Sequence, residues 1–431
     1  MTAAPPAASP VDHTAGVRRA FVALCALRWL PTGLLLPVLA VLMQSRGLTL
    51  AQVGAVVAVQ AAAVIALELP TGGLADALGR RPVLLAASAL DVASLALLLA
   101  AGSVGAFVVA SAVQGAFRAL ESGPLESWYV DTSLAIDGRA AIEQGLAHGA
   151  TATGLAISAG ALLAAGLTAV AGGYGGIGGA DPLAVPVAAA LLVRLVDVAA
   201  LAAMLTEDRR RVDLAAVRDG MKAAPAVVRS AGRLVWGRRA LLALVGVELL
   251  WGAGIGVVEL FPGPRMVELL GDSDRGVAVF GLAVALAWTV AAAGSAVAGR
   301  LTTALGGGPA RAGAVLRVVQ GAAVAVMAVS GGPLGLIGGY LAFYLVHGSA
   351  NVVHFGMVHR LVDARCRTTV LSANSLASHL GGVAGLAGLG ALAGSAGIPA
   401  ALAVAAVVLA LAAPLYGVAG TAVPVSPVVT E

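Results

Sequence analysis

Charged residues are scarce in this sequence. Asp, Glu, Lys and Arg make up 11% of its 431 residues, and Lys222 is the only lysine. A soluble domain carries about 25% charged residues, so a water-soluble surface is excluded for much of the chain. Hydrophobic residues make up 59%, and the mean hydropathy is +0.96. Lipid is therefore the expected solvent for most of the protein.

Cysteine is nearly absent as well. Cys25 and Cys366 are far apart, which argues against a disulfide framework and a CxxC metal site. No GxxxxGK[ST] loop is present, so no nucleotide-binding site is predicted. The net charge of +4 does not indicate a nucleic-acid partner, because the arginines lie between apolar runs and form no basic face. We expect no cofactor and no metal.

Twelve segments are apolar over about the 20 residues that a spanning helix needs. The segment that follows Arg18 and Arg19 is too long for a signal-peptide core, so we predict that it is the first span. The predicted spans cover 21–44, 53–75, 82–101, 105–128, 143–170, 184–206, 240–262, 277–298, 311–330, 334–358, 368–394 and 397–420. The sequence thus predicts an all-α integral membrane protein.

A basic stretch divides these spans into two sets of six. Residues 207–239 contain nine of the 26 basic residues. If the N-terminus is cytoplasmic, 19 basic residues lie on the inner side and three on the outer side. This asymmetry predicts a cell-membrane protein with both termini in the cytoplasm. The expected parts are a disordered N-terminus over 1–20, a six-helix half over 21–206, the linker 207–239, a second half over 240–420 and a tail over 421–431.

A charged turn closes one predicted span and opens the next. It reads Gly72-Gly73-Leu74-Ala75-Asp76-Ala77-Leu78-Gly79-Arg80-Arg81, after Glu68-Leu69-Pro70-Thr71. The glycines permit a tight turn, and the acid and arginines can form charge-assisted hydrogen bonds. The turn resembles the loop signature of the major facilitator superfamily, which consists of secondary transporters. The alternative is a plain positive-inside turn, which needs only Arg80 and Arg81.

The resemblance implies twelve helices in two six-helix halves, with the substrate site at the midplane between them. It also implies a conformational gate in which Asp76 meets the opposite half in the outward-facing state. Arg80 would then meet an acid at the cytoplasmic end of the fourth helix, either Glu126 or Asp131. The expected gate residues are Gly72, Asp76, Gly79, Arg80, Arg81, Glu126 and Asp131.

Other segments carry the same resemblance. Residues 46–54 are similar to the family's first outer loop, 122–131 to the end of helix four and 367–372 to the start of helix eleven. Part of the turn, 77–82, reappears as 304–309 with glycines in place of both arginines. The fifth predicted span lacks the Gly-Pro pair that many proton-driven exporters of this family carry.

Counted by depth, eight charges lie well inside the predicted spans, where each costs about 2.5–3.5 kcal/mol at the midplane. Arg118 and Glu121 are three residues apart on one helix face, and we favour a cavity role for them. Arg194 and Asp197 have the same spacing, and we favour mutual neutralisation. For Arg28 we favour the cavity over snorkelling to the surface, and for Asp91 both readings stay open. The full set is Arg28, Asp91, Arg118, Glu121, Arg194, Asp197, Glu248 and Arg317.

Two other helices carry polar stripes. Glu248 and Glu259 lie nearly on one face of helix seven, eleven residues apart, and we expect Glu248 to be a proton acceptor and Glu259 to be interfacial. His347, Asn351 and His354 share a face of helix ten, which indicates either a polar cavity face or helix–helix hydrogen bonds. The predicted substrate and proton cavity contains Arg28, Asp91, Arg118, Glu121, Glu248, His347, Asn351 and His354.

The predicted function is secondary transport of a small solute by a monomer in the lipid bilayer. We expect proton-coupled export by alternating access, because no nucleotide-binding motif is present. The alternatives are an uptake symporter for a charged metabolite and a transporter-like protein that does not transport. A membrane-embedded enzyme built around His347 and His354 is a further alternative, and it lacks a recognisable nucleophile or metal set.

Overall fold

The computed structural model describes residues 10–71, 74–174, 181–205, 207, 229, 232–362 and 367–421. Most of the predicted linker 207–239, most of the predicted tail and Cys366 lie outside the described residues. The first part of the chain forms α1 (Pro10–Leu35), α2 (Leu39–Ser45), α3 (Leu50–Thr71), α4 (Leu74–Leu78), α5 (Arg80–Ala100), α6 (Val104–Glu121), α7 (Pro124–Ile136), α8 (Ile142–Gly173), η1 (Pro182–Ala184) and α9 (Val185–Met204).

The second part forms α11 (Arg239–Leu260), α12 (Pro262–Leu270), α13 (Ser273–Leu305), α14 (Gly308–Val329), α15 (Pro333–Arg360), α16 (Arg367–Ala396), α17 (Ile398–Ala410) and α18 (Ala413–Gly420). Helices suit this sequence because lipid offers no hydrogen bonds, so each span must satisfy its own backbone groups. Among the described residues, 11 segments are long and apolar enough to cross a membrane, and 12 if one bent pair counts as a span. The predicted all-α membrane fold is confirmed.

Proline and glycine break several of these spans. The bent pair is α1 and α2, which meet at an angle of 41° around Pro37. Proline lacks the N–H that would continue the helix. The fourth span breaks between α6 and α7, where Gly123 has a φ of +93° and Pro124 starts the next helix. The seventh span breaks between α11 and α12, directly before Pro262.

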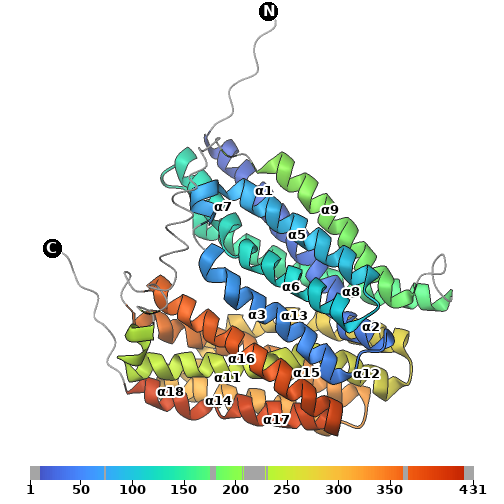
Figure 1. The fold of residues 1–431 in the computed structure, drawn as a ribbon. Helices are drawn as coiled ribbons and strands as arrows, with labels where there is room; N and C mark the ends of the chain where they lie inside the picture. Colours follow the sequence, from blue (N-terminus) through green and yellow to red (C-terminus); the bar gives the residue numbers. More distant parts are fainter. Residues whose placement is uncertain are drawn as a thin grey trace, which may run out of the picture.

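The helices form two groups that meet along two seams (Figure 1). Within the first group α1 packs on α8 and α9, and within the second α13 packs on α15. Between the groups, α3 packs on α16 and α8 packs on α13. Small residues make these seams close: Gly54 lies against the backbone of Leu386 and Gly390. On the second seam Gly281 lies against Ala161 and Ala165.

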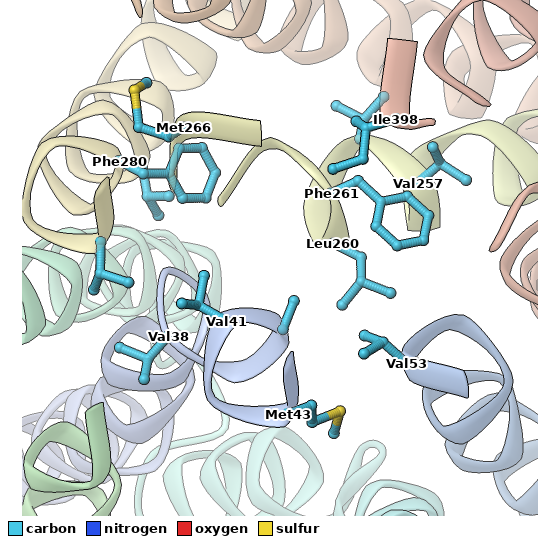
Figure 2. Close-up of a cluster of buried hydrophobic side chains, with 14 of the residues drawn as sticks. Val38, Val41, Met43, Val53, Val257, Leu260, Phe261, Met266, Phe280 and Ile398 are labelled. Atoms are coloured by element: carbon cyan, nitrogen blue, oxygen red, sulfur yellow. The ribbon is translucent and has the colours of Figure 1, made fainter. Parts of the chain in front are cut away.

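An apolar cluster joins the two groups at the end that carries α2 and α12, which we call the closed end. Figure 2 shows Val38, Val41 and Val53 of the first group in one cluster with Leu260 and Phe280 of the second. These side chains are almost completely buried. The closed end lies opposite the ends of α1 and α18 that lead to the chain termini (Figure 1).

Candidate functional site

A cavity of about 930 Å³ lies between the two groups of helices. The first group contributes side chains of α1, α3, α6, α7 and α8, and the second contributes α11 and α16. Aromatic walls come from Phe21, Trp29 and Trp251. Six charged side chains line it: Arg28, Arg118, Glu68, Glu121, Glu126 and Glu259. The cavity therefore combines apolar surface with an excess of carboxylates.

Glu121 connects the two cavity arginines. Arg28 Nε lies 3.1 Å from Glu121 Oε1, and Arg118 Nη1 lies 3.4 Å from Glu121 Oε2. Arg118 also donates to Thr32 Oγ1 at 2.9 Å, and its guanidinium lies 4.9 Å from the centre of the Trp29 ring. The structure thus brings together the predicted cavity residues Arg28, Arg118 and Glu121, and links them by ion pairs.

A buried network extends from Arg28 into the first group. Arg28 Nη1 lies 3.4 Å from Asp197 Oδ2 and donates to Ser88 Oγ at 3.1 Å. Arg194 pairs with Asp197 at 3.0 Å and with Asp91. Asp91 is 1% exposed and does not line this cavity, contrary to prediction, because Arg194 on α9 holds it in the helix interface. Its partner lies on a different helix, which local spacing could not reveal.

A second buried cluster lies within the second group. Glu248 Oε1 is 3.3 Å from His354 Nε2 and 3.7 Å from Arg317 Nη2. His354 Nδ1 is 3.1 Å from the Tyr416 hydroxyl. Glu248 and His354 therefore do not line the cavity, contrary to prediction. The reason is that α16 packs closely on α11 at this level, where Gly381 lies against the Leu249 carbonyl.

His347 and Asn351 are also absent from the cavity lining, although both were predicted there. The Asn351 amide nitrogen lies 3.3 Å from His347 Nε2, one turn away on the same helix. The His347 ring stacks on Trp251, with 5.4 Å between ring centres, and Trp251 does line the cavity. His347 thus supports a cavity wall from behind.

Glu259 lines the cavity, whereas the sequence suggested an interfacial residue. The Tyr344 hydroxyl donates to Glu259 Oε1 at 3.2 Å. Glu259 also lines a second cavity of about 250 Å³, together with Arg118, Gln60 and Gln114. Both cavities share Gln60, Arg118 and Glu259, so the smaller one continues from the larger towards the closed end.

Sequence reasoning missed two acidic residues around these sites, Glu68 and Glu207. Glu68 accepts a hydrogen bond from Ser375 Oγ at 3.4 Å, and both line the cavity with His379. Glu207 accepts hydrogen bonds from the backbone N–H groups of Arg80 and Arg81 at 3.0 and 2.9 Å. Glu68 directly precedes the charged turn, which was a usable signal, whereas nothing near Glu207 in the sequence pointed to α5.

The structure places the predicted gate residues at two separate sites. Arg80 forms an ion pair with Asp131, while Glu126 lines the cavity instead. Gly79 has a φ of +91°, which suits glycine and lets Glu207 approach the start of α5. Arg81 Nη2 donates to the Ala202 carbonyl at 2.6 Å. Gly72 and the Asp76 side chain lie outside what the structure describes.

Across the described residues, no group of three or more His, Cys, Asp or Glu side chains could hold a metal ion. The charged groups instead pair with one another or face the cavity. The arrangement offers a lined cavity large enough to bind a small solute. The family model described as the Major Facilitator Superfamily matches residues 21–386.

The chain belongs to the major facilitator superfamily. It is therefore a multi-pass membrane protein and a secondary transporter of a small molecule, and not an enzyme. No curated protein sequence matches the chain.

Solved structures agree with this fold assignment at low sequence identity. The nucleoside transporter NupG is 12% identical, with a TM-score of 0.74 over 93% of this chain and 99% of that one. A bacterial homologue of the human lysosomal transporter Spinster, inward-facing and occupied, is 14% identical, with a TM-score of 0.74 over 98% and 100%. The human organic anion transporter MFSD10 is 18% identical, with a TM-score of 0.60 over 96% and 100%.

Proposed function

We propose that this transporter exports a small solute in exchange for protons, by alternating access between two halves of the chain. The halves comprise residues 21–206 and 240–420, joined by the basic linker 207–239. In this proposal the protein acts as a monomer in the cell membrane, and the arginine asymmetry of its loops supports cytoplasmic termini. The names of the similar solved structures refer to different transported compounds, so the proposal is argued from the cavity of this protein.

The observation that carries the proposal is the cavity between the halves, lined by carboxylates from both. Glu68, Glu121 and Glu126 belong to the first half, and Glu259 belongs to the second. A carboxylate can hold either a proton or an ion pair, so these groups suit an exchange of protons for a solute. The arginines of the cavity are a weaker basis for an uptake symporter of charged metabolites, because Glu121 pairs with both of them.

The distribution of ion pairs supports movement of each half as a unit. Every ion pair among the described residues joins two residues of the same half, including the pairs of Glu121 and Glu248. The described seam at the closed end is mainly small and apolar, with Asp274 against Gly172 and a hydrogen bond from Ser158 Oγ to the Ala285 carbonyl at 3.1 Å. Opening this end would break no described ion pair, which keeps the cost of the movement low.

Proton movement in inside-out vesicles tests the proposal. A pH-sensitive dye reports whether any compound from a broad panel dissipates an imposed pH gradient. We expect at least one compound to do so, and Glu121→Gln to abolish the response. Glu143→Gln removes the same charge from an exposed site outside the cavity and should leave the response intact. A folded, inserted protein that moves no protons with any compound would contradict proton coupling.

A second variant separates a transporter from a protein of the same fold that does not transport. Asp76→Asn alters the charged turn and should reduce turnover while the protein stays folded and inserted. Equal turnover in Asp76→Asn and the parent protein would show that Asp76 has no role in the gate. Substrate binding without turnover in the parent would favour the non-transporting alternative.

A further inference from the structure

The charge balance of the cavity indicates which solutes it accepts. Four carboxylates and two guanidinium groups line it, so the lining carries more negative than positive charge. Both arginines share Glu121, and Arg28 also pairs with Asp197 behind the cavity wall. Neither arginine is therefore available to an anionic solute without competition from a carboxylate.

Two lining acids form no ion pair with an arginine among the described residues. Glu126 is exposed to the cavity, at the start of α7. Glu259 lies deeper, where the cavity joins its smaller continuation, and its described hydrogen bond comes from the Tyr344 hydroxyl. A neutral hydroxyl donor satisfies one oxygen without cancelling the charge. The cavity thus offers, at two depths, carboxylates that form no direct ion pair, although Arg118 lines the same junction as Glu259.

Two tryptophans also line the cavity. Trp29 already has a cation near its ring, since the Arg118 guanidinium lies 4.9 Å from the ring centre. Trp251 is held by the stacked His347 ring and lines the opposite wall on α11. Aromatic rings attract cations through their negative faces, and this attraction grows when water is excluded.

We propose that the transported solutes are organic cations with an aromatic or aliphatic body, and that Glu126 and Glu259 serve as their counter-ions. The apolar body contacts Trp29 and Trp251, while the positive charge meets a carboxylate that forms no described ion pair with an arginine. An organic anion would meet the same apolar walls together with an unfavourable net charge. This inference rests on the proposed function in one respect, namely that the cavity is the path of the transported solute.

Two ions of nearly equal shape and opposite charge test this inference. Tetraphenylphosphonium and tetraphenylborate each carry four phenyl rings, so a difference in binding reports charge rather than size. Quenching of tryptophan fluorescence in the purified protein measures binding at equilibrium without any gradient. We expect saturable binding of tetraphenylphosphonium, at least about tenfold tighter than that of tetraphenylborate.

Matched variants assign the counter-ions. Glu126→Gln and Glu259→Gln should each weaken tetraphenylphosphonium binding by about tenfold, the loss of one charge contact. Gln keeps an oxygen that can accept the Tyr344 hydrogen bond, so Glu259→Gln preserves the local packing. Glu143→Gln should bind like the parent protein. Size-exclusion profiles identify variants that fail to fold, and Glu126→Gln at an exposed site is the safer of the two.

Either of two results overturns the inference. One is equal or tighter binding of tetraphenylborate, and the other is unchanged tetraphenylphosphonium binding in both cavity variants. Neither result depends on proton coupling, because no gradient is present in the binding measurement. A protein that exchanges protons for a solute yet prefers the anion would keep the proposed function and refute the cation preference.

Discussion

A single methyl group on α13 should change which end of this transporter is open. The Cβ of Ala at position 281 would lie 2.8 Å from the Ala161 carbonyl oxygen and 2.9 Å from Ala165 Cβ. Carbon contacts settle near 3.5–4.0 Å, so α8 and α13 must separate by about 0.5–1 Å to accept the methyl group. Overpacking of this kind costs about 1–3 kcal/mol. If this energy destabilises only the conformation in which this end is closed, the population with this end open rises by about 5- to 150-fold.

Spin-label distances can measure this shift. Labels at Tyr174 and Leu334, which are 81% and 85% exposed at the closed end, report separation of the two halves. Cys25 and Cys366 are first replaced by Ser. We expect Gly281→Ala to lengthen the distance distribution between these labels.

The control is a second Gly→Ala substitution on the same helix. Gly299 has open space around its missing side chain, so Gly299→Ala should leave the distances unchanged. Identical distributions for Gly281→Ala, Gly299→Ala and the parent would refute the steric reasoning. If Gly281→Ala does not fold, Gly54→Ala on the other seam tests the same idea.

Three further predictions concern stability and the seam. Arg194→Met leaves the buried carboxylate of Asp91 without its guanidinium partner and Asp197 with Arg28 alone, and should cost about 3–5 kcal/mol, seen as a lower unfolding temperature in detergent. An unchanged unfolding temperature would mean that the pairs contribute nothing. Glu207→Ala removes the acceptor at the start of α5 and should cost about 0.5–2 kcal/mol in the same measurement; equal stability would contradict the capping role. Ser158→Ala removes the hydrogen bond to α13, which should destabilise the closed end by about 1 kcal/mol or less. The spin-label distances should therefore lengthen, as for Gly281→Ala, and a shift towards shorter distances would contradict this.

The sequence was sufficient to predict the spans because lipid imposes a strict demand on backbone hydrogen bonding. A segment such as 277–298 has no alternative to a helix once it enters the membrane. The bend near Pro37 could be expected from proline chemistry, although its angle could not. Membership of the superfamily rested on the charged turn around Asp76, where a short motif has a definite place between two spans.

The candidate site was harder to predict. A sequence indicates how deep a residue lies along its membrane span, but not which helix or cavity its side chain faces. Glu248 and Glu259 share one face of a helix, yet only Glu259 lines the cavity. The difference arises where α16 covers α11, so Glu248 turns to Arg317 and His354. Asp91 found its partner on α9, about 100 residues away in the chain. Such pairings depend on which helices touch, and local periodicity carries no information about that.

The ion pairs of Arg28 also set an order for assembly during synthesis. Arg28 lies on the first span, and its partner Asp197 on the sixth lies 169 residues further along the chain. At about 5–20 residues per second, the first span waits roughly 10–30 s for that carboxylate. Glu121 on the fourth span, 93 residues after Arg28, supplies an earlier partner, and before it is made the arginine needs water, lipid head groups or the insertion machinery to hold its charge. The first half can therefore lock into its final packing only when its last helix arrives.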